Sequence, residues 1–224
     1  MLKRHKEIIM HGGIQMSTET PHRLLKEKQR QERAALILQA AEEVLAEKGY
    51  HDTSMDEIAA RVGVAKGTLY QHFPSKEDLV FALFERELEK TLQAVEQIVA
   101  TDLPARARLE RILRQMYGEL LGKRMQLLFS ILSDVDVHKG LIAKKLQMRD
   151  RMQELAKGLR AVLEEGKEDG SFDPAIPTVV MLMTFFSLLS PHGIEQLVTQ
   201  EQLSPEELVS SVERIYFTGI NAKK

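Results

Sequence analysis

Two short helical segments joined by a glycine-containing turn, within residues 53–76, constrain the fold of this chain more than any other feature. Thr53 or Ser54 begins the first segment as an N-cap, and an acidic residue three positions later is typical of a capping box. Gly63 ends this segment, and the second runs over residues 66–73. Such a pair, with hydrogen-bonding side chains on its second member, is typical of a helix-turn-helix, whose second helix enters the major groove of DNA.

Beyond this pair, apolar residues recur at steps of three and four, as at Leu88, Leu92 and Val95. This spacing places them on one side of a helix, where they can pack against a neighbouring helix. No alternating strand pattern of useful length interrupts it. The sequence therefore predicts an all-α chain, in which the apolar run 179–189 is a buried helix that is too short to cross a bilayer.

The composition argues against several kinds of site. The chain has no Cys, which excludes disulfides, thiolate metal ligands and a Cys nucleophile, and which fits a reducing cytoplasm. Its 7 His are scattered without the spacing of a zinc site, and no phosphate-binding Gly-Lys-Ser/Thr sequence is present. We therefore expect no catalytic residue, no metal and no cofactor, and an all-α enzyme is the weaker alternative.

The charge pattern favours an anionic partner. The net charge is only −2, but residues 58–76 contain no acidic side chain. The same stretch contains the cations Arg61, Lys66 and Lys76. A stretch of this kind suits contact with a polyanion such as DNA.

The glycine-linked pair and the helix before it resemble the DNA-binding domain of the tetracycline-repressor (TetR) family. The resemblance rests on Gly49-Tyr50, Thr53-Ser54, Ile58-Ala59, Val62-Gly63-Val64, Lys66-Gly67-Thr68-Leu69-Tyr70, His72-Phe73, Ser75-Lys76 and Leu79. Together with the helix before them, these positions cover about a fifth of the chain, and the remainder is similar only in helical content, length and the stretch 163–172 (LEEGKEDGSF). Ala65 departs from the family, which often has Ser there, so a hydroxyl is missing at the start of the recognition helix.

The resemblance implies a homodimer that binds a palindromic operator in double-stranded DNA and acts as a repressor. The residues expected to contact DNA are Thr53, Ser54, Lys66, Gly67, Thr68, Tyr70, Gln71, His72 and Lys76. Of these, Thr53, Ser54 and Lys76 would hold phosphates at or near helix N-termini. Gln71 is the expected base reader, because an amide can pair with adenine. Arg30 and Arg33 either reach the DNA backbone or minor groove or form a solvated helix face.

These expectations divide the chain into a flexible arm (1–26), a helix-turn-helix domain (27–76) and a helical effector-binding and dimerisation domain (77–224). Either Met1 or Met16 is the true start. The helix that follows residue 76 joins the last two parts, so we expect it to transmit an effector signal.

The resemblance also implies an effector cavity and a dimer interface in the last part. Met and Phe adapt to apolar ligands, so a lipophilic effector is expected against Met116, Phe129, Met152 and Phe185. The expected dimer contacts are Val180, Thr184, Leu188, Leu208, Ser211, Val212 and Ile215. Either set can instead be plain core, and a DNA-binding dimer that senses no small molecule is the alternative function.

Overall fold

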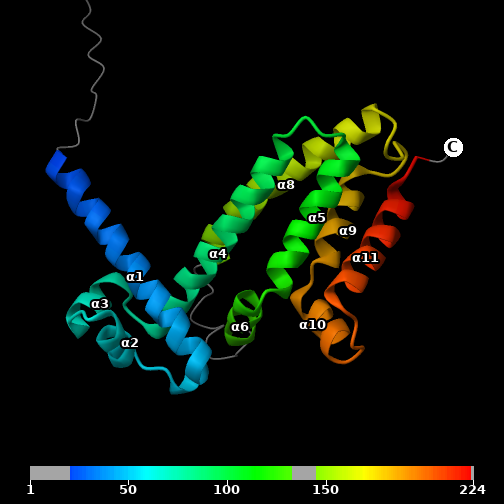
Figure 1. Ribbon diagram of the computed structural model, residues 1–224. Helices are drawn as coiled ribbons and strands as arrows, with labels where there is room; N and C mark the ends of the chain where they lie inside the picture. The colour runs from blue at the N-terminus through cyan, green and yellow to red at the C-terminus, as the bar shows by residue number, and fades with distance from the viewer. Residues whose placement is uncertain (1–20, 133–144, 223–224) are drawn as a thin grey trace, which may run out of the picture.

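The computed structural model describes residues 21–132 and 145–222, and these residues fold into α-helices arranged as a small N-terminal group and a larger C-terminal bundle (Figure 1). The helices are α1 (Pro21–Asp52), α2 (Met55–Val62), α3 (Lys66–His72), α4 (Lys76–Val99), α5 (Ala105–Leu121), α6 (Lys123–Leu132), α8 (Lys145–Glu168), α9 (Thr178–Leu188), α10 (Pro191–Thr199) and α11 (Pro205–Ile220). Within the described ranges, extended pairing is limited to an isolated bridge between Phe172 and Asn221. The all-α prediction is confirmed.

The predicted helix-turn-helix is present as α2 and α3. The Ser54 hydroxyl caps α2 by accepting a hydrogen bond from the Glu57 amide. Gly63 ends α2 in the left-handed region, with φ 77°, a conformation that costs glycine little. At the start of α3, Ala65 makes no side-chain cap, as expected from the missing hydroxyl.

The N-terminal core consists of buried residues from α1, α2, α3, the first turns of α4, and α6. Its members include Ile37, Leu45, Ile58, Leu69, Phe73, Leu79, Leu83, Phe84, Met125, Leu128 and Ile131. Ile58, Leu69 and Phe73, which belong to the motif shared with the TetR family, all lie in this core. The contribution of α6 is a finding that the sequence did not indicate, because α6 follows α3 by about fifty residues along the chain.

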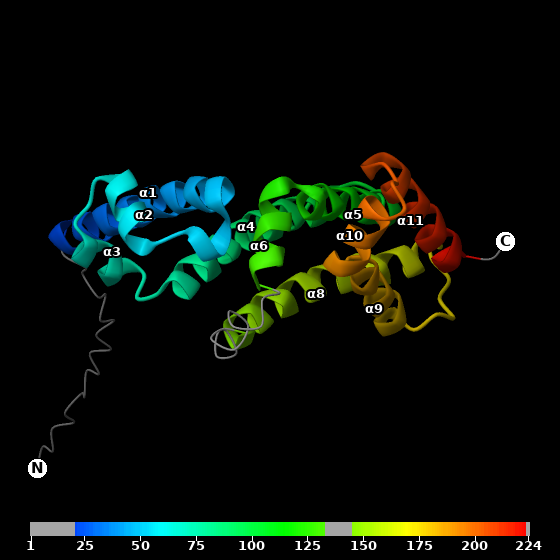
Figure 2. The same ribbon diagram turned by 90° about the horizontal axis from the view of Figure 1, so that it is seen from below.

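The C-terminal core lies between α4, α5, α8, α9 and α11, and includes Leu92, Leu109, Tyr117, Leu159, Phe185 and Phe217. Two buried tyrosines fasten α9 to its neighbours. Tyr117 of α5 donates to the Leu188 carbonyl at 2.5 Å, and Tyr216 of α11 donates to the Met181 carbonyl at 3.0 Å. Because α4 runs from the N-terminal group into this bundle (Figure 2), it joins the two cores.

Helix α1 begins earlier than predicted. Residues 21–26 belong to α1 rather than to a flexible arm, while residues 1–20 of that arm lie outside the described residues. Pro21 is favourable at the first helical position, and the following residues are mostly good helix formers without Gly or Pro. The prediction of a flexible segment up to residue 26 is therefore wrong for its last six residues.

Candidate nucleic-acid interface

Helix α3 divides into a buried side and an exposed side. Leu69 is fully buried, whereas Lys66, Gly67, Tyr70 and Gln71 are exposed. The predicted contacts Thr68 and His72 are half-buried. A Cβ built on Gly67 would meet no atom of the chain within 4 Å. The exposed side therefore presents hydrogen-bonding groups together with a place where another molecule can approach the backbone closely.

The cations of the acid-free stretch have partners from other segments. Lys66 Nζ lies 2.7 Å from Asp56 Oδ2 of α2, and this hydrogen bond raises the pKa of Lys66. Arg61 makes a two-pronged contact with Glu47 of α1, at 2.9 and 2.8 Å. These pairs are exposed, so phosphates can compete for the cations at modest cost.

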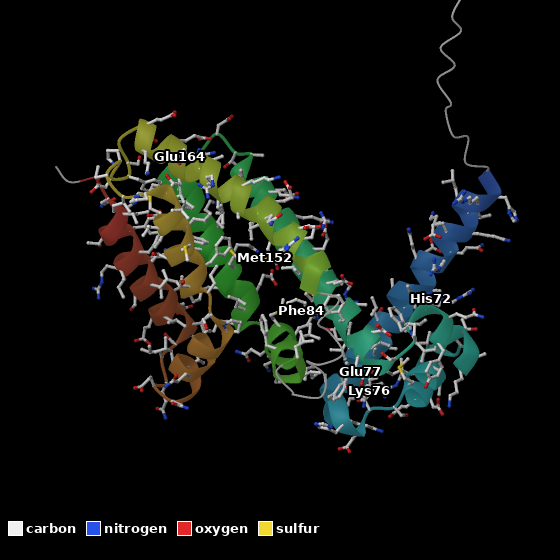
Figure 3. All side chains as sticks on the ribbon, turned by 180° about the vertical axis from the view of Figure 1, so that it is seen from behind. His72, Lys76, Glu77, Phe84, Met152 and Glu164 are labelled. Atoms are coloured by element: carbon white, nitrogen blue, oxygen red, sulfur yellow. The ribbon has the colours of Figure 1, made fainter. Side chains whose placement is uncertain are left out.

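Lys76 is less available for a phosphate than predicted. Its Nζ donates to the carbonyls of Tyr50 at 2.6 Å and Thr53 at 2.8 Å, and lies 4.2 Å from the centre of the Tyr50 ring. The Tyr50 hydroxyl in turn donates to Glu77 Oε1 at 2.7 Å, which lowers the pKa of Glu77. Figure 3 shows Lys76 and Glu77 at this junction. Lys76 thus fastens the start of α4 to the last turn of α1 and to the linker that follows it, and one of its three N–H donors is left for DNA.

Thr53 and Ser54 have different structural roles. Thr53 is 2% exposed, and its hydroxyl donates to the Gly49 carbonyl at 2.6 Å. Its side chain is therefore committed to closing the turn at Gly49, where φ is 78°. The prediction that the Thr53 side chain holds a phosphate is withdrawn for this reason. Ser54 is exposed at the N-terminus of α2, and its O–H can donate to a phosphate while its oxygen caps the helix.

His72 ends α3 near two arginines of α1. Partial burial lowers the pKa of His72, and the nearby charges of Arg30 and Arg33 lower it further. Arg30 and Arg33 are exposed. They therefore extend the exposed side of α3 with two cations from an element that the sequence places about forty residues earlier.

Comparison with known proteins decides the family. The family described as bacterial regulatory proteins, tetR family, matches residues 37–83, which contain α2, α3 and the start of α4. The fatty acid metabolism regulator protein of Bacillus subtilis is 24% identical over 200 residues, covering 88% of this chain and all of the relative. This chain belongs to the TetR family. It is a transcriptional regulator with an N-terminal helix-turn-helix.

Solved structures support the assignment over the whole TetR fold. A TetR/AcrR-family transcriptional regulator from Thermobifida fusca is 25% identical, covers 84% of this chain and 98% of its own, and has a TM-score of 0.71. The regulator FadR from Bacillus subtilis, solved in complex with stearoyl-CoA, is 22% identical, covers 84% of this chain and 99% of its own, and has a TM-score of 0.63. The C-terminal bundle is therefore part of the shared fold, although the family match covers only the N-terminal part.

In this TetR-family chain, the predicted pocket residues fall into two groups. Met116 and Met152 are half-buried against the C-terminal core, and Phe185 lies inside that core. Phe129 instead packs against the N-terminal core, edge-to-face on Phe84 with ring centres 5.6 Å apart. Phe129 therefore does not belong to one pocket with the other three.

The predicted dimer residues also divide. Val180, Thr184 and Ile215 are exposed on α9 and α11. Leu208 and Val212 are buried in the C-terminal core, while Leu188 and Ser211 are half-buried. Leu208 and Val212 are thus covered by their own subunit, and the prediction that they form the interface is withdrawn. Val179 and Met183 of α9, which the sequence did not indicate, are also exposed, at 46% and 65%.

Two negative findings complete the site. Among the described residues, no group of three or more His, Asp or Glu is arranged to hold a metal ion. Across the same part of the chain, none of the helices combines the length and apolar character needed to span a membrane.

Proposed function

We propose that this TetR-family regulator is a homodimeric repressor that places α3 in the major groove of a two-fold symmetric operator. The observation that carries the proposal is the division of α3 into a buried Leu69 side and an exposed side with Lys66, Tyr70 and Gln71. Gln71 is the proposed base reader, and Ser54 and Lys66 are proposed phosphate contacts. Arg30 and Arg33 are proposed to contact the flanking backbone or minor groove, since they lie beside the end of α3.

The proposed dimer interface is the exposed apolar surface of α9 and α11. Val179, Val180, Met183 and Ile215 are between 46% and 67% exposed. Large apolar side chains gathered in this way favour burial against another protein surface. A second copy of the chain is the natural occupant, because a symmetric operator requires two reading helices about one DNA turn, roughly 34 Å, apart.

The proposed effector is a long-chain fatty acyl-CoA. Its support is the similarity, over the full length of the relative, to a regulator of fatty acid metabolism, and the fold shared with a regulator that binds stearoyl-CoA. The aliphatic chain would lie against the C-terminal core near Met116, Met152 and Phe185, where side chains are apolar and adaptable. Binding would favour a conformation in which the reading helices are wrongly spaced, and so release the operator.

The proposal is tested in two steps. DNA duplexes that bind the protein are first selected from a random pool at low ionic strength, and the selected sequence is expected to be palindromic. Palmitoyl-CoA is then titrated into the complex, and we expect it to lower operator affinity while a matched concentration of free CoA does not. Failure to enrich any duplex would contradict DNA binding, whereas an operator complex that ignores every acyl-CoA would leave a DNA-binding dimer without this effector.

The base-reading role of Gln71 predicts a change in specificity. Gln71→Ala should relax discrimination at one symmetric pair of operator positions, at a cost of roughly 1–3 kcal/mol for the preferred base. Affinities for the operator and its single-base variants provide the measurement. Unaltered discrimination would remove Gln71 from base reading.

A further inference from the structure

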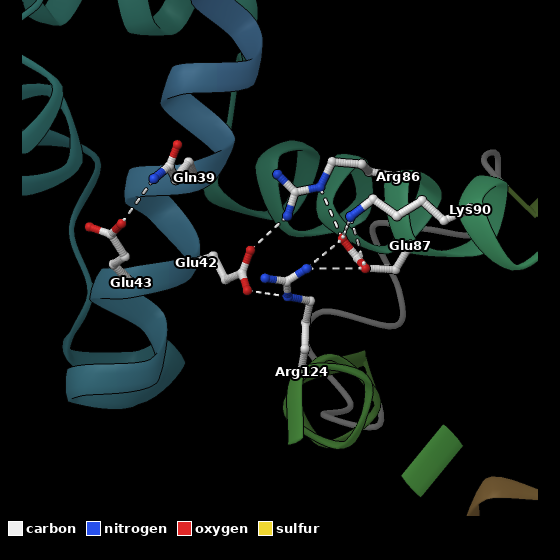
Figure 4. A network of polar contacts seen from close by, with 7 residues as sticks. All are labelled: Gln39, Glu42, Glu43, Arg86, Glu87, Lys90 and Arg124. Carbon is white, nitrogen blue, oxygen red and sulfur yellow. Dashed lines mark hydrogen bonds and ion pairs between the residues drawn. The ribbon is translucent and has the colours of Figure 1, made fainter. Parts of the chain in front are cut away.

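An ion-pair network joins three helices where the N-terminal group meets the C-terminal bundle (Figure 4). Arg124 of α6 contacts Glu42 of α1 through Nε and lies 3.3 Å from each carboxylate oxygen of Glu87 of α4 through Nη1. Arg86 of α4 bridges the same two acids, 2.7 Å from Glu42 and 3.0 Å from Glu87. One guanidinium from α6 therefore links both long helices of the N-terminal group.

Burial makes this network more constraining than a surface salt bridge. Glu87 is only 6% exposed, and a carboxylate in such a place requires cations to remain charged. Burial raises the pKa of Glu87, but the ion pairs with Lys90, Arg124 and Arg86 outweigh it and hold the pKa below its ordinary value. Since Glu87 keeps its charge, it forms ion pairs with Arg86, Lys90 and Arg124.

Apolar packing beneath the network fastens α6 to the same helices. Met125, Leu128 and Ile131 are buried in the N-terminal core, together with residues of α1 and α4. Phe129 packs edge-to-face on Phe84 of α4. Helix α6 is thus attached to the DNA-binding helices by a buried apolar side and by Arg124.

The other end of α6 leads into the C-terminal bundle. Gly122, with ψ 135°, separates α5 from α6, and α5 contributes Leu113 and Tyr117 to the C-terminal core. Beside Arg124, a groove of about 430 Å³ lies between α1, α5 and α6, bordered by Ala46 and Glu119. A shift of α5 can therefore reach α1 through α6 without passing along α4.

We propose that Arg124 is a positioning residue that transmits effector binding to the DNA-binding helices, by fixing α6 to Glu42 of α1 and Glu87 of α4. The proposal rests on the proposed function and adds a second connection to the one along α4. Without Arg124, α6 would be attached to the DNA-binding helices by its apolar side alone, and these helices would follow movements of the bundle less closely. The coupling between effector and operator therefore depends on Arg124, whereas each binding site by itself does not contain it.

The experiment compares variants of the full-length dimer. Arg124→Met keeps an unbranched apolar side chain and removes the guanidinium, and Glu42→Gln removes the charge at the α1 end of the contact. Arg106→Met is the matched control, because Arg106 is similarly exposed (41% against 47%) and makes an ion pair with Glu110 inside the C-terminal bundle. For each variant, operator affinity is measured with and without saturating palmitoyl-CoA, and palmitoyl-CoA affinity is measured directly.

We expect Arg124→Met and Glu42→Gln to bind palmitoyl-CoA as the unmodified protein does. The ratio of operator affinity without effector to operator affinity with effector should fall about fivefold or more. The double variant should lose less than the two single losses combined, because both substitutions remove the contact between Arg124 and Glu42. Arg124→Lys should restore part of the ratio, since an ammonium can still pair with one carboxylate. Arg106→Met should leave the ratio unchanged.

An unchanged ratio in Arg124→Met, or an equal loss in Arg106→Met, overturns the proposal. Hydrogen exchange gives a reading that needs no effector: Arg124→Met should speed exchange in α6 and around Glu42, and unchanged exchange there also overturns the proposal. If palmitoyl-CoA does not bind the unmodified protein, the effector class is wrong, and hydrogen exchange still decides whether Arg124 holds α6 to α1.

Discussion

At the scale of single residues, the exposed side of α3 contains a glycine that the fold itself does not need. A Cβ added at Gly67 would meet no other atom of the chain within 4 Å, and the φ of Gly67 is not positive. Gly63, by contrast, has φ 77° and is required by the turn after α2. A glycine in a helix usually costs stability, so its presence at position 67 is best explained by close approach of DNA.

The first prediction concerns Gly67→Ala. The variant should be more stable by up to about 1 kcal/mol, because alanine favours the helix. It should bind the operator about tenfold more weakly or worse, because the methyl group meets DNA, and tenfold corresponds to about 1.4 kcal/mol. Thermal unfolding and operator titration measure the two effects. Gly118→Ala in α5, which also has open space, is the control and should leave operator affinity unchanged; if both variants bind DNA equally well, Gly67 does not approach it.

The second prediction concerns pH. The folded chain lowers the pKa of His72 by partial burial and by the charges of Arg30 and Arg33, so it binds this proton less readily than the unfolded chain. The contribution of His72 to the free energy of unfolding is therefore lost as the pH falls below the pKa of histidine in the unfolded chain, about 6.5. Bound phosphates act in the opposite sense and raise the pKa, so operator binding should strengthen as the pH falls from about 7.5 to about 6.

His72→Gln provides the comparison. Operator affinity of the unmodified protein should rise several-fold over this range, while that of the variant should rise less. An identical pH response in the two proteins would place His72 outside the interface.

At the scale of helices, contacts between the end of α1 and the start of α4 stabilise the helix-turn-helix formed by α2 and α3. Helix α1 is kinked at Gly49, where φ is 78°, and the Lys76 ammonium donates to the carbonyls of Tyr50 and Thr53 beyond the kink. These contacts explain why the Gly49-Tyr50 pair and Lys76 occur together in one motif. They also show that a lysine at a helix N-terminus can serve the fold before it serves a ligand.

The third prediction separates Lys76 from Lys66. Lys76→Ala should lower the free energy of unfolding by about 1–3 kcal/mol, because two carbonyls lose their donor. Lys66→Ala should leave stability nearly unchanged, since its partner Asp56 is exposed, but should reduce the salt dependence of operator binding by about one unit. Denaturant titration and operator affinity at several salt concentrations measure these effects. A stable Lys76→Ala variant would contradict the fastening role.

At the scale of the whole molecule, the two opposite ends of the folded protein present different surfaces. The polar side of α3 lies in the N-terminal group, and α9 and α11, which carry the exposed apolar residues, lie at the opposite end of the bundle (Figure 1). A two-fold axis at α9 and α11 would leave both copies of α3 exposed to solvent. The arrangement therefore suits a dimer that holds two reading helices apart.

The fourth prediction follows from this arrangement. Met183→Asp combined with Ile215→Asp should convert the dimer to monomers, because each carboxylate would be buried without a partner. Light scattering after size-exclusion chromatography measures the mass, and operator affinity should fall with the dimer. Leu36→Asp, at an equally exposed apolar position on α1 (58%), should remain dimeric. A double variant that stays dimeric would move the interface elsewhere.

Local patterns in the sequence determined the helix-turn-helix and the all-α class. The Ser54 cap, the Gly63 turn and the buried Leu69 depend on residues within a few positions of each other, so their spacing is sufficient to predict them. The same holds for Ala65, whose missing hydroxyl leaves α3 without a side-chain cap. Candidate DNA contacts on the exposed side of α3 follow from the same short stretch.

Only the tertiary structure decided which of the candidate residues are already engaged. The stretch 58–76 has no acidic residue in sequence, yet α1 and α2 bring Glu47 to Arg61 and Asp56 to Lys66. The packing of α6 into the N-terminal core, and with it the contact of Arg124 with Glu42, likewise joins residues that are far apart along the chain. Pairings of this kind depend on how helices pack, and helix packing is set by contacts between distant residues that no local spacing records.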